Sequence, residues 1–239
     1  MALIFGTDDD DILRGTADDD TILGLAGGDQ LLGEDGNDTL IGDEGWDFIN
    51  GGNGNDVIDG GGTNDELWGL PGDDTIFGGD GPDRLFGNEG NDRLHGGAGN
   101  DYAEGGDDGD QILGDDGDDV LLGGAGWDFI NGGSGNDRIE GGATNDELWG
   151  LPGDDTIFGG DGPDRLFGNE GADNLSGDQL GSDQAAANDD LLIGGDDADL
   201  LVGDSSAILF TFPLCPKPIA PRAGWRADPS RSWSAAGRW

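Results

Sequence analysis

Aspartate recurs at every ninth residue through most of this 239-residue chain, with glycine at a constant distance before it. The block at 51–59, "GGNGNDVID", begins at Gly51 and has Asp56 as its sixth residue, and the same phase holds for nineteen consecutive blocks from Gly6 to Ser176. Each block therefore supplies one carboxylate at a fixed place, together with backbone carbonyls that glycine allows to curl toward a common point. These are hard oxygen ligands, of the kind that bind Ca²⁺ through about six to eight oxygens in tolerant geometry.

One loop offers too few oxygens for a calcium ion, whereas two stacked loops supply enough. Mg²⁺ fits less well because it demands a tighter octahedron and keeps its waters. Transition metals are disfavoured because His95 and Cys215 are the only soft or borderline ligands in the sequence. The candidate metal ligands are the sixth-residue aspartates: Asp11, Asp20, Asp29, Asp38, Asp47, Asp56, Asp65, Asp74, Asp83, Asp92, Asp101, Asp110, Asp119, Asp128, Asp137, Asp146, Asp155, Asp164 and Asp173.

The composition is strongly acidic, with 52 glycines, 33% hydrophobic residues and a formal net charge of −43. Such a composition normally leaves a chain unable to collapse, so something must offset the charge repulsion. The excess of acid favours cations and argues against nucleic acid, whose phosphates it would repel. No apolar run is long enough for a membrane span, and the N-terminal "MALIFGTDDDD" contains no conventional signal peptide.

The nine-residue period predicts a loop followed by a very short strand. We expect the first six residues of each block to form the loop, with Asn or Asp at position five, such as Asn55 or Asn136, where a positive φ is tolerated. Positions seven to nine alternate out, in, out, which buries the Leu or Ile at position eight; Ala103 is the one exception. Stacked on identical neighbours, these three-residue strands form a parallel ladder with a continuous Leu/Ile core.

Three blocks, "GGNGNDVID" (51–59), "GGAGNDYAE" (96–104) and "GGSGNDRIE" (132–140), resemble the G-G-x-G-x-D-x-U-x nonapeptide of RTX, or hemolysin-type calcium-binding, repeat proteins. The resemblance covers residues 6–203 and implies an all-β fold, a parallel β-roll (two-sheet solenoid) with two nonapeptide repeats per turn. It also implies multiple Ca²⁺ ions held between loops one turn apart. The sixth-residue aspartate would give the side-chain ligand, and the second and fourth residues would give carbonyls.

Family members are typically secreted by bacteria through a type I exporter and fold when they meet external calcium. The resemblance therefore implies a secreted, extracellular protein that lacks an N-terminal signal peptide.

Several blocks depart from the family pattern. Position four is not glycine in five of them, which carry Asp9, Asp18, Thr63, Asp108 and Thr144. We expect weaker or empty sites there. Pro82 and Pro163 at position five remove a donor and fix φ. An eight-residue insertion at 177–184 breaks the phase, and two further blocks follow at 185–193 and 194–202.

The organisation along the chain changes near its end. We expect the calcium-binding roll to occupy residues 1–203, with regular repeats over 6–176 and an irregular end over 177–203. Residues 204–239 are rich in Pro, Arg and Trp, and from Ser205 onward they contain a single acid. We expect this tail to be disordered or the product of a shifted reading frame, with a working secretion signal as the alternative.

A second, longer repeat carries aromatic residues. Residues 45–94 and 126–175 match at 44 of 50 positions, at an offset of 81. The outward position nine of the two copies holds Trp68, Phe77, Phe86, Trp149, Phe158 and Phe167. Because the offset is an odd number of nonapeptides, Trp68 and Phe86 are predicted to share one sheet and Trp149 and Phe167 the opposite one. Phe77 and Phe158 are predicted to exchange sheets in the same way. The rings either stack to stabilise the ladder, or form outward patches for self-association, a glycan or another surface partner.

No pattern typical of catalysis is present. The single His95 rules out H-E-x-x-H, and no Ser/His/Asp set or phosphate-binding glycine motif is found, so we do not expect an enzyme. The sequence predicts a secreted calcium-binding repeat protein with a structural or interaction role. The alternative is a truncated calcium-binding and secretion module of a larger RTX toxin or secreted hydrolase whose effector domain is absent.

Overall fold

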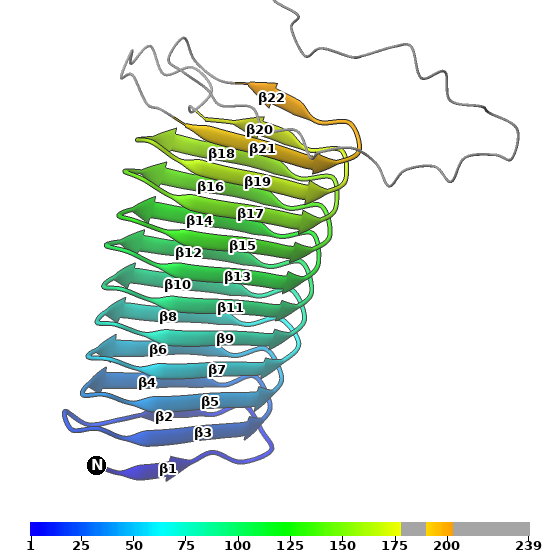
Figure 1. Cartoon of the computed structure of the whole chain (residues 1–239). Helices are drawn as coiled ribbons and strands as arrows, with labels where there is room; N and C mark the ends of the chain where they lie inside the picture. Colours follow the sequence, from blue (N-terminus) through cyan, green and yellow to red (C-terminus); the bar gives the residue numbers. More distant parts are fainter. Residues whose placement is uncertain (178–189, 203–239) are drawn as a thin grey trace, which may run out of the picture.

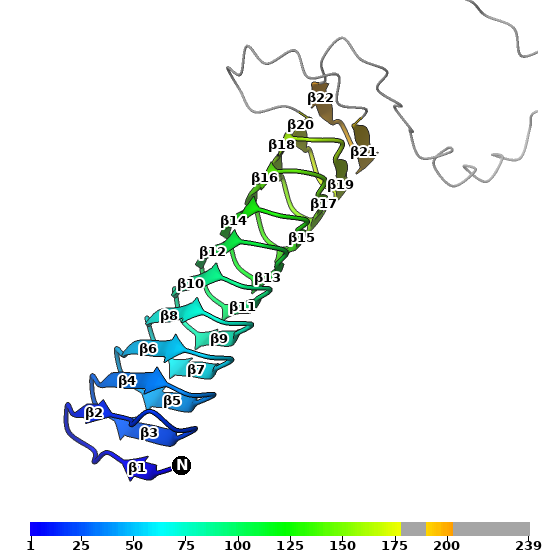
Figure 2. The same cartoon turned by 90° about the vertical axis from the view of Figure 1, so that its left-hand side faces the viewer.

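Two parallel β-sheets form a long solenoid in which the chain passes alternately from one sheet to the other (Figures 1 and 2). The computed structural model describes residues 1–177 and 190–202. No helix long and apolar enough to cross a membrane lies in these two segments. The N-terminus lies at one end of the stack of turns, and each later pair of strands adds one further turn (Figure 1).

The odd sheet contains β1 (Leu3–Phe5), β3 (Thr21–Ala26), β5 (Thr39–Glu44), β7 (Val57–Gly62), β9 (Thr75–Asp80), β11 (Arg93–Ala98), β13 (Gln111–Asp116), β15 (Phe129–Ser134), β17 (Glu147–Pro152), β19 (Arg165–Glu170) and β21 (Leu191–Asp196). The even sheet contains β2 (Ile12–Arg14), β4 (Gln30–Asp35), β6 (Phe48–Asn53), β8 (Glu66–Pro71), β10 (Arg84–Glu89), β12 (Tyr102–Asp107), β14 (Val120–Ala125), β16 (Arg138–Ala143), β18 (Thr156–Asp161), β20 (Asn174–Ser176) and β22 (Leu200–Val202).

The register of the strands sets two nonapeptides per turn. Ile58 of β7 pairs with Ile76 of β9, eighteen residues later, and the same step relates neighbouring strands throughout the regular repeats. Between turns, the amide of Thr39 donates to the carbonyl of Asp20 at 2.9 Å, which continues the ladder up to the edge of the loop. The predicted all-β parallel roll is confirmed.

Most strands are longer than predicted, with six residues in place of three. They run from position seven of one block to position three of the next, because the first residues of a block continue the pleat and its alternation of buried and exposed side chains. The left-handed residues also differ from the prediction. They lie at positions two and four, as in Gly52 (φ 112°) and Gly54 (φ 126°), and not at position five.

The core is a double column of position-eight side chains. Every such residue from Ile22 to Leu175, together with Leu192, is fully buried, and Ala103 occupies its place in the column as predicted. Burying one such aliphatic side chain contributes about 1.5–3 kcal/mol. The column therefore holds the two sheets together along the whole roll.

The two copies of the longer repeat present opposite faces, as predicted. Trp68 and Phe86 lie on β8 and β10 of the even sheet, whereas Trp149 and Phe167 lie on β17 and β19 of the odd sheet. Each pair is stacked with ring centroids 4.1 Å apart. The third ring of each set changes sheet in the same way.

The ladder resumes after the insertion near the C-terminal end. Leu175 of β20 pairs with Leu201 of β22, a step of eighteen residues plus the eight inserted ones. The interior of the insertion, within residues 178–189, lies outside the described part of the chain, as does the tail from residue 203 onward. The predictions made for the tail therefore remain predictions.

Candidate metal centre

The sixth-residue aspartates lie where each loop enters the next strand, and they point into the roll. From Asp20 to Asp173 each of them is at most 3% exposed. Asp11, in the first loop, is half-buried. Because successive loops alternate between the two edges of the roll, the aspartates form two rows that run along its length.

Within each row, the carboxylates join neighbouring turns. The amide of Asp38 donates to Oδ1 of Asp56 at 2.7 Å, and the amide of Asp56 donates to Oδ1 of Asp74 at 2.7 Å. The same bond repeats in both rows with lengths of 2.7–2.9 Å for the aspartates from Asp20 to Asp155. One oxygen of each side chain is therefore satisfied by the protein itself.

The second oxygen has no such partner. Within the described residues, Oδ2 is buried and accepts no hydrogen bond in every sixth-residue aspartate from Asp29 to Asp155, and in Asp173. A buried carboxylate oxygen without a partner is costly, and groups of this kind in native structures call for an explanation such as an ion. Two rows of such oxygens at a constant spacing form an arrangement suited to a series of cations.

A glycine at position one makes the space beside each carboxylate. A Cβ placed on Gly60 would lie 2.7 Å from Oδ2 of Asp65 and 2.7 Å from the carbonyl oxygen of Gly78 on the next turn. Both distances are too short for a carbon atom, so a side chain here would displace the oxygens. The absence of a side chain at position one keeps an oxygen-lined cradle open.

Backbone carbonyls bring further oxygen atoms to the space between the loops. A Cβ on Gly54 would collide with the carbonyl oxygen of Gly36, and a Cβ on Gly61 with that of Asp43, one turn earlier. The carbonyls of positions two and four therefore point along the roll into the gap between stacked loops. The left-handed φ angles at these two positions produce this orientation.

The non-glycine residues at position four fall into two groups. Thr63, Asp108 and Thr144 adopt φ of 80°, 73° and 84°, so their loops keep the shape of the glycine-containing loops. Asp9 and Asp18, in the first two loops, do not adopt a left-handed conformation.

The first two loops also differ in their hydrogen bonds. Thr7 donates to Oδ2 of Asp11 through its amide (2.7 Å) and its hydroxyl (2.8 Å), and Thr16 does the same for Asp20. Threonine donors here occupy the oxygen that lacks a partner in the later loops. Oδ2 is therefore less available to a cation in these two loops than in the later ones.

Two aspartates of the same kind were not among the predicted ligands. Asp190 is 2% exposed and its Oδ1 accepts from the amide of Asp164 at 3.0 Å. Oδ1 of Asp199 accepts from the amide of Asp173 at 3.2 Å. Both are the sixth residues of the blocks that follow the insertion, so restarting the nine-residue phase after it would have identified them.

Burial raises the pKa values of aspartates within the two rows. Desolvation, partly offset by the hydrogen bond from the preceding turn, raises the pKa of Asp56 to about 7 and those of Asp65 and Asp110 to about 8. Neighbouring carboxylates add to the increase, Asp83 at Asp65 and Asp92 at Asp110. The protein alone therefore disfavours the charged form that it places in these rows.

The model of the RTX calcium-binding nonapeptide repeat matches residues 5–40, 41–76, 68–103, 104–139, 132–166, 149–179 and 184–207. The chain belongs to the RTX calcium-binding nonapeptide-repeat family. A comparison with curated proteins gives no match. The RTX roll is a calcium-binding structural fold, and its repeats cover almost all of the described chain.

The donor set of this RTX roll fits calcium better than softer metals. In the two described segments, no three side chains of His, Cys, Asp or Glu come together as a metal-binding group. A site here must therefore combine one or two carboxylates with main-chain carbonyls, which are hard oxygen donors suited to Ca²⁺. His95 lies on the outer face, stacked on Phe77 at 5.1 Å and away from the rows of aspartate.

Proposed function

We propose that this RTX roll is a secreted, extracellular protein that binds multiple Ca²⁺ ions between its stacked loops and folds as it binds them. The observation that carries the proposal is the double row of buried Oδ2 atoms that lack a partner. It is supported by the cradle beside each position-one glycine and by the family to which the chain belongs.

The proposed side-chain ligands are the sixth-residue aspartates from Asp11 to Asp173, together with Asp190 and Asp199. Carbonyls of positions two and four complete each site from the adjoining turn. Bound Ca²⁺ supplies positive charge beside carboxylates that would otherwise be buried next to one another, in a chain with a net charge of −43. The loops of Asp11 and Asp20 are expected to bind most weakly, because threonine donors already hold their oxygens.

Folding and calcium binding are expected to be coupled. The sites exist only when loops from two turns are stacked, so the free energy of binding contributes directly to folding. Extracellular calcium modules bind at about 10⁻⁴–10⁻³ M, which suits a protein that stays unfolded inside the cell and folds outside it. Export by a type I route is part of the same proposal.

We propose a structural or interaction role and not catalysis. The duplicated aromatic clusters on the outer faces favour an interaction, because they are presented twice on opposite sheets. The alternative, a calcium-binding module of a larger toxin or secreted hydrolase, differs from it only in what the roll is attached to.

Far-ultraviolet circular dichroism during a calcium titration tests the proposal. We expect little sheet in chelator and a cooperative gain of sheet near 10⁻⁴–10⁻³ M Ca²⁺, on the order typical of extracellular modules. NaCl at matched ionic strength is the control for charge screening, and Mg²⁺ is the control for ion type. Spectra that are unchanged from chelator to millimolar calcium would exclude the proposal.

A further inference from the structure

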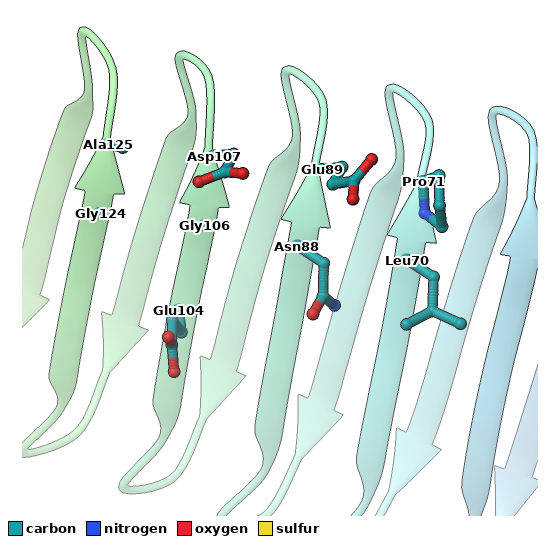
Figure 3. Close-up of a pocket in the computed structure, with 9 residues that line it drawn as sticks. All are labelled: Leu70, Pro71, Asn88, Glu89, Glu104, Gly106, Asp107, Gly124 and Ala125. Atoms are coloured by element: carbon teal, nitrogen blue, oxygen red, sulfur yellow. The ribbon is translucent and has the colours of Figure 1, made fainter.

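A groove crosses the outer face of the even sheet over β8, β10, β12 and β14 (Figure 3). It encloses about 610 Å³. The floor is bare because Gly106 and Gly124 carry no side chains, while Leu70 and Asn88 rise on one side of it (Figure 3). An adjoining hollow of about 210 Å³ extends the groove to the stacked rings of Trp68 and Phe86.

The wall of the groove is held in a strained conformation. Leu70 (φ 78°) and Asn88 (φ 83°) occupy position two, where β12 and β14 have the unstrained Gly106 and Gly124. A left-handed leucine is a genuine outlier, because its Cβ crowds the following carbonyl. Leu25 (φ 85°) has the same conformation at position two of β3, so the conformation is a feature of the roll, and the wall arises from the side chain that stands there.

The rings beside the groove are fixed by hydrogen bonds. The carboxylate of Glu66 accepts from Nε1 of Trp68 at 3.1 Å and from Nη1 of Arg84 at 3.4 Å. The guanidinium of Arg84 lies 5.2 Å from the ring centroid of Phe86. The rings are thus ordered in advance, and their polar and cationic partners are supplied from within the protein.

The odd sheet carries the same cluster. Glu147 accepts from Nε1 of Trp149 at 3.2 Å and from Nη1 of Arg165 at 2.6 Å, and Trp149 stacks on Phe167. A hollow of about 350 Å³ lies on β17, β19 and β21, lined by Leu151, Pro152, Asn169, Glu170, Gly195 and Asp196. Leu151 (φ 78°) repeats the strain of its counterpart. The hollow on the odd sheet therefore has the same rings and the same leucine wall as the groove on the even sheet.

The chemistry of the lining indicates the ligand. Nδ2 of Asn88 donates to the carbonyl of Phe86 at 3.2 Å, and the carboxylates of Glu89, Glu104 and Asp107 only accept hydrogen bonds. A ligand must therefore donate many hydrogen bonds and carry no negative charge. A sugar ring meets both requirements, because its hydroxyls surround the edge and its C–H faces pack on aromatic and aliphatic surface. We propose that each groove binds a neutral glycan.

Other occupants suit the grooves less well. Phosphates, sulfates and uronates would be repelled by the carboxylates of Glu89, Glu104 and Asp107, and a second copy of the roll would bring its own acids against them. A basic peptide would find the ring face of Phe86 already occupied by Arg84, and that of Phe167 by Arg165.

The placement of the two grooves makes the roll bivalent. They face opposite directions and lie nine nonapeptides apart, roughly 20 Å along the axis at about 4.8 Å per strand. One roll can therefore hold two glycan chains, and linked binding events raise the overall affinity. We expect it to cross-link polysaccharide.

Affinity electrophoresis of the full calcium-loaded chain tests the inference. Native gels contain hydroxyethylcellulose, laminarin or galactomannan as neutral probes, and alginate as the anionic control. We expect retardation in at least one neutral gel and none in alginate. The double variant Trp68→Ala, Trp149→Ala should weaken binding about tenfold or more, as expected for loss of an aromatic contact. Each single variant should still bind but should no longer cross-link the polysaccharide, measured as turbidity.

Matched variants separate binding from folding. Trp46 and Trp127 are 56% and 58% exposed and lie on loops outside the grooves, so Trp46→Ala with Trp127→Ala should leave binding unchanged. Leu70→Gly with Leu151→Gly removes the leucine part of the wall and introduces the residue that Gly52 of β6 and Gly133 of β15 have at position two. These variants should fold in calcium as the parent does, and yet lose glycan affinity.

Three results would overturn the inference. They are no retardation by any neutral probe, retardation that the Trp68, Trp149 double variant leaves unchanged, or retardation only in an additional gel that contains poly-lysine and only at low salt. Sedimentation could instead show calcium-dependent dimers of the parent chain that are absent in the same double variant. That result would assign the grooves to binding of a second copy of the roll. The inference rests on a folded roll, so calcium-induced dichroism is recorded for every sample. Absence of glycan binding by the parent chain with intact dichroism counts against the grooves alone.

Discussion

The amide of Asp38 donates a 2.7 Å hydrogen bond to Oδ1 of Asp56, the equivalent residue one turn further along the roll. Oδ2 of the same carboxylate is buried and, within the described segments, has no hydrogen-bond partner. One side chain thus links two turns through one oxygen and offers the other to the gap between the loops. In the proposed calcium sites, folding and ion binding therefore depend on the same residue.

Asp56→Ala should destabilise the roll more than Asp11→Ala. The first change leaves the buried amide of Asp38 without its acceptor, at a cost of about 1–3 kcal/mol, and removes a ligand in the middle of a row. Asp11 is half-buried and lies in the first loop, where Thr7 already occupies Oδ2. Calcium titrations followed by circular dichroism should show a higher midpoint for Asp56→Ala. Asp56→Asn keeps an acceptor for the amide and should lose mainly calcium affinity, and equal midpoints for the two alanine variants would contradict the assignment.

Gly60→Ala and Gly62→Ala should behave differently, although the two residues lie in the same block. A Cβ on Gly60 would enter the cradle between Asp65 and Gly78, whereas a Cβ on Gly62 would meet only the carbonyl oxygen of Asp43, at 3.9 Å. We expect Gly60→Ala to lower calcium affinity and thermal stability, and Gly62→Ala to be tolerated. Calorimetry with calcium measures the affinity, and thermal melts measure the stability. Unchanged calcium affinity and stability in Gly60→Ala would contradict the proposed cradle.

The calcium-free roll should become more stable as the pH falls. Burial raises the pKa of Asp56 to about 7 and that of Asp65 to about 8, while unfolded aspartate titrates near 3.9, so between about pH 4 and 8 the folded form binds more protons than the unfolded chain. Its free energy of unfolding therefore decreases as the pH rises through this range. In chelator, we expect the sheet signal to increase on acidification from about pH 8 to 5.

Calcium binding near neutral pH should in turn release protons, because the ligands are carboxylates. Calorimetry in buffers of different ionisation enthalpy detects this release. A sheet signal in chelator that does not change with pH would contradict the linkage.

Ile58→Ala and Val57→Ala compare the two faces of one strand. Ile58 is fully buried in the position-eight column, whereas Val57 is 42% exposed. We expect Ile58→Ala to cost about 2–5 kcal/mol and Val57→Ala about 0.5 kcal/mol or less, measured by urea unfolding in saturating calcium. Similar costs for both would mean that the column does not hold the sheets together.

The resemblance to RTX repeats implied the roll and its two nonapeptides per turn, and the nine-residue phase was sufficient to predict the parallel ladder and its Leu/Ile core. These features follow from local rules: glycine where a loop must turn, and one aliphatic residue per block on the inner side of the pleat. The odd offset of the longer repeat also placed Trp68 and Trp149 on opposite sheets without any knowledge of coordinates. The candidate aspartates came from the same phase, and Asp190 and Asp199 were missed because the insertion interrupts it.

The tertiary structure alone decided everything that depends on contact between turns. Six-residue strands, left-handed residues at positions two and four, and a carboxylate that uses one oxygen while burying the other arise between residues eighteen positions apart. The groove beside Trp68 has the same origin, because its floor, wall and rings come from different strands. The nine-residue period is visible in the sequence itself, whereas the hydrogen bonds between turns and the hollows on the sheets form only when the turns are stacked.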